Sequence, residues 1–190
     1  GTFLVVNTTK NADKIFLHTG TVDRGVICTG DTVKASINAE CRNMIKRNHT
    51  AAHLLQAALR SVLGNHVEQA GQLVNAREVR FDFTHFNALT EEEIAKVEFI
   101  VNEFIMFAVP VESMEMPIEE AKKMGAMMLF GEKYGNIVRV VKAGDFSTEF
   151  CGGTHVSNSG QIGLFKIMSE SSVAAGVRRI TAVTGTNLLL

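Results

Sequence analysis

The clearest pattern of hydrophobic and polar positions lies between Asn48 and Leu63, where apolar residues recur at three- and four-residue spacing. This spacing places them on one face of an α-helix. The apolar positions are Leu54, Leu55, Ala58, Leu59 and Val62. Gly64 follows directly, and glycine commonly ends a helix. The pattern therefore predicts a helix over residues 48–63 whose apolar face is turned toward a core.

Two further helices are predicted downstream. Thr90 and Glu93 have the spacing of a capping box, in which each side chain binds the other residue's backbone N–H. The apolar periodicity of residues 94–105 continues this second helix, which should end before Pro110. A third, shorter helix is expected over residues 117–124, because proline is favoured at the start of a helix.

The remaining apolar runs are short and indicate β-strands. Residues 79–83 alternate strictly between apolar and polar positions, which is typical of a half-buried strand. The other runs with strand character are 3–7, 15–18, 32–37, 109–116, 137–141, 163–168 and 177–183.

Strands mixed with only three helices, without regular alternation, favour the α+β class. We predict an antiparallel sheet packed with about three helices. Residues 1–42 contain too few short strands for a stable sheet of their own, and are expected to be a truncated segment of a small β-barrel. Residues 43–190 are expected to form the second domain, which carries the candidate chemistry.

Composition narrows the class of protein. The 190 residues are 46% hydrophobic and 21% charged, which is typical of a globular protein with a core. No apolar run approaches the roughly 18 residues that span a bilayer, so no membrane partner is expected. The chain starts without Met or a basic leader, and we expect it to begin within a longer protein.

The cysteines and the net charge add two expectations. Cys28, Cys41 and Cys151 are odd in number and far apart, which argues against a disulfide framework and for a reducing, cytoplasmic location. A formal net charge of -1 gives no sign of a protein that coats nucleic acid. Any nucleic acid would have to be held by a local basic patch.

Two short motifs carry the candidate chemistry. His49 and His53 lie four residues apart, and therefore on the same side of the predicted helix. About a hundred residues later, Cys151 and His155 flank a segment with two glycines that can form a tight loop. Three imidazoles and one thiolate make a tetrahedral set, and Zn²⁺ suits such ligands best. The sequence predicts a zinc site made by these four side chains.

Ordinary structural explanations exist for each half of this set. His49 and His53 are also compatible with polar positions on a helix face, and Cys151 with a small buried hydrophobe. The helix motif lacks the glutamate of the metalloprotease pattern His-Glu-x-x-His. Four protein ligands suggest a closed structural site, whereas their origin in a helix start and a glycine loop favours catalysis. The sequence alone leaves this choice open.

Several segments resemble the editing domain of alanyl-tRNA synthetases. They are residues 47–55, 80–83, 129–135, 144–155 and 176–180. Freestanding trans-editing proteins and, more loosely, threonyl-tRNA synthetase editing domains share the two histidine-containing motifs. The similarity extends from about residue 10 to about residue 185.

The resemblance implies hydrolysis of mischarged seryl- or glycyl-tRNA(Ala) by a deacylase domain cut from an alanine–tRNA ligase. It assigns His49, His53, Cys151 and His155 to zinc binding, with Cys151 also taking part in catalysis. Gln69 would line the amino-acid pocket, where its amide could pair with a seryl hydroxyl. The implied partners are the tRNA(Ala) acceptor end carrying Ser or Gly and the remainder of the synthetase. Such editing has a physical reason, because a pocket built for a methyl group cannot strongly reject a hydroxymethyl group.

The basic residues expected to contact tRNA are Arg80, Lys133, Arg139, Arg178 and Arg179. Neighbouring residues on a strand face opposite ways, so one of the last two could face the pocket. No general base is identified, because the nearby Asp145 and Glu149 fit structural roles better.

Three alternatives stay open at this level. The chain could be a non-catalytic, zinc-stapled module that binds RNA or holds the synthetase together. It could edit seryl-tRNA(Thr), or it could hydrolyse a small ester or amide without any tRNA.

Overall fold

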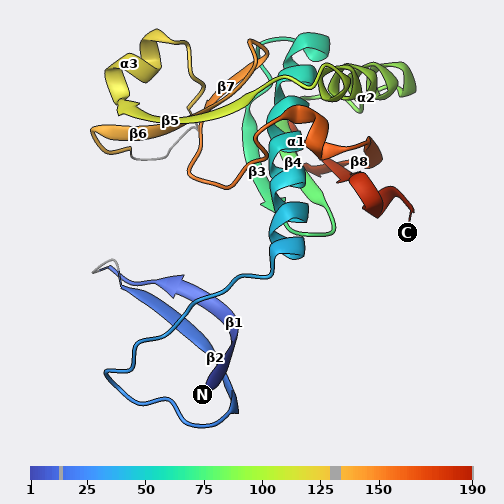
Figure 1. Ribbon diagram of the computed structural model, residues 1–190. Helices are drawn as coiled ribbons and strands as arrows, with labels where there is room; N and C mark the ends of the chain where they lie inside the picture. The colour runs from blue at the N-terminus through green and yellow to red at the C-terminus, as the bar shows by residue number, and fades with distance from the viewer. Residues whose placement is uncertain (13–14, 129–133, 190) are drawn as a thin grey trace. The chain divides into compact units, whose positions relative to one another are not determined.

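The computed structural model describes residues 1–12, 15–128 and 134–189 (Figure 1). The chain divides into two compact units, Gly1–Ile37 and Asn38–Leu190. Residues 31–38, at the division, have no regular secondary structure.

The first unit is a β-hairpin. Its strands β1 (Thr2–Lys10) and β2 (Phe16–Arg24) pair in antiparallel fashion. The strand predicted over residues 32–37 is wrong. Val33 and Ile37 are exposed and no neighbouring strand offers them hydrogen bonds, so the apolar run has neither a partner nor a core to stabilise it. The described part of the unit contains no closed barrel.

The second unit contains the three predicted helices. Their bounds are α1 Ala39–Leu63, α2 Glu91–Met106 and α3 Ile118–Lys123. The first helix begins before the predicted Asn48, because the side chain of Asn38 caps it by accepting from Cys41 N. The capping box of Thr90 and Glu93 is confirmed. In the described part of the chain, no helix is both long and apolar enough to cross a membrane.

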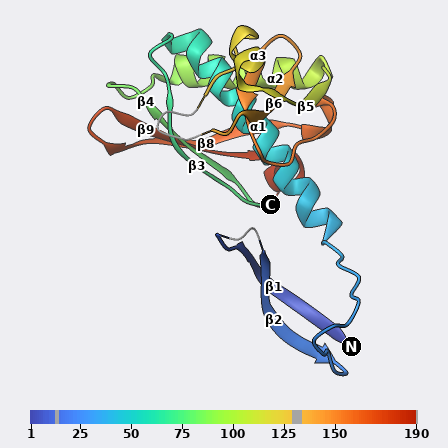
Figure 2. The same cartoon turned by 90° about the vertical axis from the view of Figure 1, so that its left-hand side faces the viewer.

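The second unit also contains two antiparallel sheets, which confirms the α+β class (Figures 1 and 2). The larger sheet has the order β3 (Gln69–Val74), β4 (Val79–Thr84), β9 (Val177–Thr184), β8 (Phe165–Ala174). The smaller has the order β5 (Val111–Pro117), β6 (Ile137–Ala143), β7 (Ser147–Phe150). Two short 3-10 helices, η1 (Ser159–Ile162) and η2 (Gly185–Leu189), complete it.

The main core lies between the larger sheet and the helices α1 and α2. Alternate residues of β4, Val79, Phe81 and Phe83, are buried, as the sequence pattern predicts. They share one cluster with Leu54 and Leu59 of α1. Complete burial of such a side chain stabilises the fold by roughly 1.5–3 kcal/mol. This packing fixes α1 across the sheet, and with it the direction of its histidines.

A buried asparagine sets the position of α1 along the sheet. Asn48 is fully buried, and its Nδ2 donates to the backbone oxygen of Asn75, 2.8 Å away, in the β3–β4 turn. Its Oδ1 accepts from the hydroxyl of Thr184 at the end of β9, at 2.7 Å. Both polar ends of the amide are therefore satisfied by the sheet. The link lies one residue before His49, so it also positions the start of the histidine motif.

We expect Asn48→Ala to lower the free energy of unfolding by about 1–3 kcal/mol, because it leaves buried polar partners unsatisfied. Urea unfolding would measure this as a lower midpoint with an unchanged m-value. Asn43→Ala, at an exposed position of the same helix, is the control and should stay within about 0.5 kcal/mol of the parent. Equal stability of the two variants would show that the buried link contributes nothing.

Candidate metal centre

Four side chains from distant parts of the chain converge beside α1. The ligand atoms of His49, His53, Cys151 and His155 all lie within 4.8 Å of one another. Cys151 Sγ lies 3.5 Å from His49 Nε2 and 3.3 Å from His155 Nε2. Sulfur and nitrogen ligands of one tetrahedral zinc ion are about 3.6 Å apart, given the usual Zn–S and Zn–N bond lengths. The two measured separations therefore fit a single ion.

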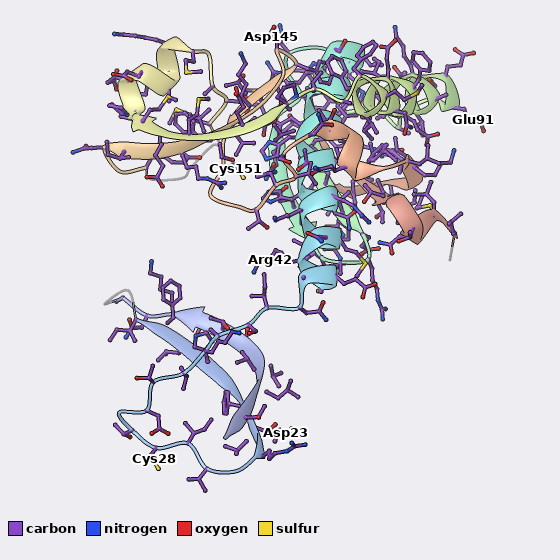
Figure 3. All side chains as sticks on the ribbon, in the orientation of Figure 1. Asp23, Cys28, Arg42, Glu91, Asp145 and Cys151 are labelled. Atoms are coloured by element: carbon purple, nitrogen blue, oxygen red, sulfur yellow. The ribbon has the colours of Figure 1, made fainter. Side chains whose placement is uncertain are left out.

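Cys151 is placed by β7, which the sequence pattern did not reveal. This strand pairs with β6, and the backbone N–H of Cys151 extends the pairing by donating to Arg139 O at 3.0 Å. The chain then turns through two glycines toward α1 (Figure 3, where Cys151 is labelled). The loop is thus anchored at the strand end that faces the histidines.

Arg139 holds this loop in place. Its Nη1 donates to the backbone oxygens of Cys151 and Gly153, and its Nη2 donates to Ser113 Oγ at 2.9 Å. Arg139 is also one of the residues predicted to contact RNA, which stays a prediction. In the structure its guanidinium binds oxygens of the loop that carries Cys151.

Glu149 orients His53. The carboxylate lies 2.6 Å from His53 Nδ1, and its other oxygen accepts from Ser147 Oγ at 2.9 Å. The contact with Nδ1 is an ion pair by distance and is not aligned as a hydrogen bond. His53 Nε2 is buried and has no hydrogen-bond partner among the described residues. A carboxylate on one nitrogen and a free second nitrogen is the usual arrangement of a metal-bound histidine.

Thr50 orients His155. The hydroxyl of Thr50 donates its only proton to Lys46 O at 2.9 Å. Its oxygen can therefore only accept, and it does so from Val156 N at 3.2 Å. His155 Nδ1, 3.2 Å away, must then be the protonated nitrogen that donates to Thr50. This tautomer leaves the lone pair on His155 Nε2, the nitrogen that faces Cys151.

The charges in the cluster suit a cation. Burial raises the pKa of the Cys151 thiol, but interactions with the nearby imidazoles of His155, His49 and His53 outweigh it and lower the pKa to about 3. Burial lowers the pKa of His53, but Glu149 and Cys151 outweigh it and raise the pKa to about 10. Burial lowers the pKa of His155 to about 4 despite its bond to Cys151. The cluster thus already holds a thiolate and a neutral imidazole, and metal binding would displace a proton from His53.

A pocket of about 440 Å³ opens beside the ligand set. His49, His53 and Cys151 form one part of its lining, and Gln69 and Gln72 of β3 form another. Gln69 is half-buried and is the first residue of its strand, rather than part of an exposed turn. The structure therefore brings the predicted pocket residue and three of the predicted ligands to the same cavity.

The other predicted residues lie elsewhere. Arg178 makes a two-pronged ion pair with Glu170, at 2.5 and 2.7 Å, and Arg179 makes one with Asp82, at 2.7 Å for both bonds. Neither arginine lines the pocket. Arg80 lies opposite Thr181 in the β4–β9 pairing, and its buried Nε has no hydrogen-bond partner among the described residues.

Three further positions named from the sequence are Lys133, Asp145 and Glu149. Lys133 lies outside the described residues, as do residues 129–132 of the same motif. Asp145 has a fully solvated carboxylate paired with Lys142 at 2.9 Å, so it is not part of the metal centre. Glu149 lies beside His53 in the cluster, and its predicted structural role stays a prediction.

Thr50 was missed as a functional position, although a visible signal existed. It lies between the two histidines, and a hydroxyl at that point of a helix can reach either a backbone oxygen one turn earlier or a neighbouring ligand. Only the folded structure shows that it does both, because His155 comes from a segment about a hundred residues away.

We expect Gly153→Ala to abolish stoichiometric zinc binding. A Cβ at Gly153 would overlap the imidazole of His49, whereas a Cβ at Gly152 would meet nothing within 4 Å. Zinc content after dialysis, measured by atomic absorption, should be near zero for Gly153→Ala and unchanged for the matched control Gly152→Ala. Circular dichroism would confirm that both variants fold. Full zinc content in Gly153→Ala would contradict the proximity of the loop to His49.

A second expectation concerns Thr50. Replacing it with valine keeps the shape but removes the acceptor for His155 Nδ1–H, and should weaken zinc affinity roughly 10- to 100-fold. Thr50→Ser retains the hydroxyl and should bind zinc like the parent. Competition with a chelating indicator measures both affinities. Equal affinity of the valine and serine variants would rule out a role for the hydroxyl.

The sequence of the chain is similar to a known protein family and to known alanine–tRNA ligases. Residues 138–181, which include Cys151 and His155, match the family described as the threonyl and alanyl tRNA synthetase second additional domain. The chain is 61% identical to alanine–tRNA ligase 1 of Lachnoclostridium phytofermentans over 88% of its length. It is 54% identical to the alanine–tRNA ligase of Pelotomaculum thermopropionicum over 95% of its length, and 57% identical to that of Bacillus velezensis over 89%.

These matches cover 19%, 21% and 19% of the three relatives, so the chain spans about a fifth of their length. At this level of identity over most of the chain, the relationship extends through the α1 histidines as well as the glycine loop. The chain therefore belongs to the alanyl-tRNA synthetase family and corresponds to the editing segment of such an enzyme.

Proposed function

We propose that this domain hydrolyses the ester bond of mischarged seryl- and glycyl-tRNA(Ala), using Zn²⁺ held by His49, His53, Cys151 and His155. The observation that carries the proposal is the convergence of these four side chains at the edge of a pocket that also contains Gln69. Two of the ligands come from a helix and two from a glycine loop. A substrate in the pocket would therefore lie directly beside the ion.

A zinc ion in this position supplies Lewis-acid chemistry, polarising the ester carbonyl or lowering the pKa of a water molecule. Glu149 keeps His53 oriented by holding Nδ1, and Thr50 does the same for His155. Arg139 keeps the loop that carries Cys151 close to α1. Glu149 is engaged by His53 and Ser147, so its assignment is to orientation of the ligand set rather than to proton transfer.

Selection of the amino acid is assigned to Gln69. Its side-chain amide has both a donor and an acceptor, and it lines the same cavity as the ligands. A hydrogen bond to the seryl hydroxyl would favour serine over alanine, because a site built to bind a hydroxyl discriminates against the analogue that lacks one. Glycine is accepted because its side chain is smaller than that of alanine.

The partners follow from the substrate. We assign the domain to the acceptor end of tRNA(Ala), to the remainder of the synthetase and to the cytoplasm. Contacts with the tRNA at Arg80, Lys133, Arg178 and Arg179 stay predictions. Because Arg178 and Arg179 already pair with carboxylates, RNA binding there would have to compete with these internal ion pairs.

A second candidate function is a zinc-stapled module without turnover. The observation in its favour is the number of protein ligands, since four usually make a closed structural zinc site. The open pocket that reaches three of the ligands argues for catalysis. A deacylation assay distinguishes the two functions, because only the catalytic domain turns over substrate.

We expect the domain to deacylate seryl-tRNA(Ala) at least roughly tenfold faster than alanyl-tRNA(Ala), because only serine can pair with Gln69. Acid-precipitable radiolabelled amino acid, followed over time, measures both rates. A chelator should stop the reaction and added zinc should restore it. Equal rates on both substrates, or full activity after verified zinc removal, would contradict the proposal.

Cys151→Ala provides the matched test of the site. It should lower the deacylation rate on the order of 100-fold or more, since it removes the only sulfur ligand from the set. Cys41→Ala is the control, because Cys41 lies in the first turn of α1 and outside the cluster. Turnover at the parent rate in Cys151→Ala would remove that side chain from the mechanism.

A further inference from the structure

A second cavity, of about 500 Å³, is lined by His155, which does not line the first cavity. One part of its lining comes from α1, and the rest comes from β5 and the segment after His155. The lining residues are Asn43, Lys46, Arg47, Val111, Ser113, His155, Val156, Ser157 and Gln161. His155 thus belongs to the lining of this cavity while its Nε2 faces Cys151 and the metal centre. The two cavities share no described lining residue, yet each is lined by part of the ligand set.

The second cavity is positively charged. Lys46 and Arg47 line it, and no aspartate or glutamate is among its described lining residues. In the described part of the chain, neither cation has a carboxylate within ion-pair distance. This local charge contrasts with the formal net charge of -1 for the whole chain. An anionic ligand is therefore favoured here by an uncompensated field.

The polar groups of the cavity divide into engaged and free ones. Arg47 Nε donates to Gln161 O at 3.1 Å, and Ser113 Oγ accepts from Arg139 at 2.9 Å. The Gln161 side chain bonds to Ser157, at 3.2 Å between Gln161 Nε2 and Ser157 Oγ. By contrast, the Lys46 ammonium, the Asn43 amide and the terminal nitrogens Nη1 and Nη2 of Arg47 make no hydrogen bond to any described residue. These groups are the ones available to a ligand.

Helix geometry links the free groups to the metal centre. Asn43, Lys46 and Thr50 follow at i, i+3 and i+7, so they lie along one face of α1. Thr50 contacts His155, and Lys46 precedes Thr50 by about one helical turn, or roughly 5.4 Å. A ligand group beside Lys46 would therefore lie one turn away from the ligand set.

The first cavity offers no comparable cation. Among the described residues that line it, the only basic one other than the histidines is Arg139, which is occupied by loop oxygens and Ser113, and the lining also contains Glu149. The ester that the proposed function would cleave links an amino acid to the terminal ribose of an RNA. One side of this ester is small and uncharged apart from its amino group, and the other side leads within one nucleotide to a phosphodiester.

We propose that the second cavity binds the RNA backbone next to the aminoacylated ribose, with Lys46 contacting a phosphate and Asn43 a sugar or phosphate oxygen. The inference deepens the proposed function and rests on its substrate class. It assigns the aminoacyl group to the cavity with Gln69, and the terminal nucleotides to the cavity with Lys46. The ligand set connects the two assignments, because His155 lines one cavity and the other three ligands line the other.

The test is binding of uncharged tRNA(Ala) transcript to the zinc-loaded chain, measured by fluorescence anisotropy at several salt concentrations. Lys46→Ala should weaken binding roughly three- to tenfold and reduce the slope of log affinity against log salt by about one. Lys46→Arg should retain affinity, because it keeps the charge. Lys96→Ala, at an exposed position of α2 outside both cavities, is the control and should bind like the parent.

Zinc content and melting temperature should be unchanged in Lys46→Ala, because its ammonium makes no contact within the described chain. Parent-like affinity and salt slope in Lys46→Ala would overturn the inference, as would an equal loss in Lys96→Ala or no salt-dependent RNA binding by the parent. Binding needs no hydrolysis. If Lys46→Ala loses RNA binding and the parent does not deacylate its substrate, only the proposed function is contradicted. If the parent deacylates its substrate and Lys46→Ala binds RNA like the parent, only the role of the second cavity is contradicted.

Discussion

The close approach of the Cys151–His155 loop to α1 is the constraint on which the rest of this domain depends. The loop contributes two of the four candidate ligands and the helix the other two. Contact is so close at Gly153 that a single methyl group would displace His49. Two neighbouring contacts support this approach. Asn48 sets the position of the helix on the sheet, and Arg139 holds the loop from the side of β6.

Charge compensation makes the cluster tolerable inside the protein. A thiolate, an imidazolium and a carboxylate lie together, and each would be costly if buried alone. Cys151 Sγ lies close to the Nε2 atoms of His49 and His155, while Glu149 contacts both His53 and Ser147. Such a network orients the imidazole rings before any ion arrives, so less ordering is required when metal binds.

The cations of the domain fall into two groups. Arg139, Arg178 and Arg179 have planar guanidiniums that pair with fixed oxygens inside the domain, and this use suits the geometry of arginine. Lys46 has no such partner, and it lines a cavity next to the ligand set. The difference explains why a count of basic residues is a poor guide to RNA contacts in this chain. A basic side chain that has no partner inside the domain is the one that is available to a ligand.

The periodicity of the chain determined the three helices and most of the strands of the second unit, because burial against a core requires apolar residues at regular spacing. The two histidines of α1 and the glycine loop were likewise identifiable from local spacing. Tertiary structure decided what depends on contacts between distant segments: the pairing of β7 with β6, the bond from His155 to Thr50, and the occupation of Arg178 and Arg179 by carboxylates. The run at 32–37 failed as a strand for the same reason, since a strand needs a neighbour that its own sequence cannot supply. Local sequence specifies which side chains share a helix face or a loop, but a hydrogen-bond partner a hundred residues away is set only when the core packs.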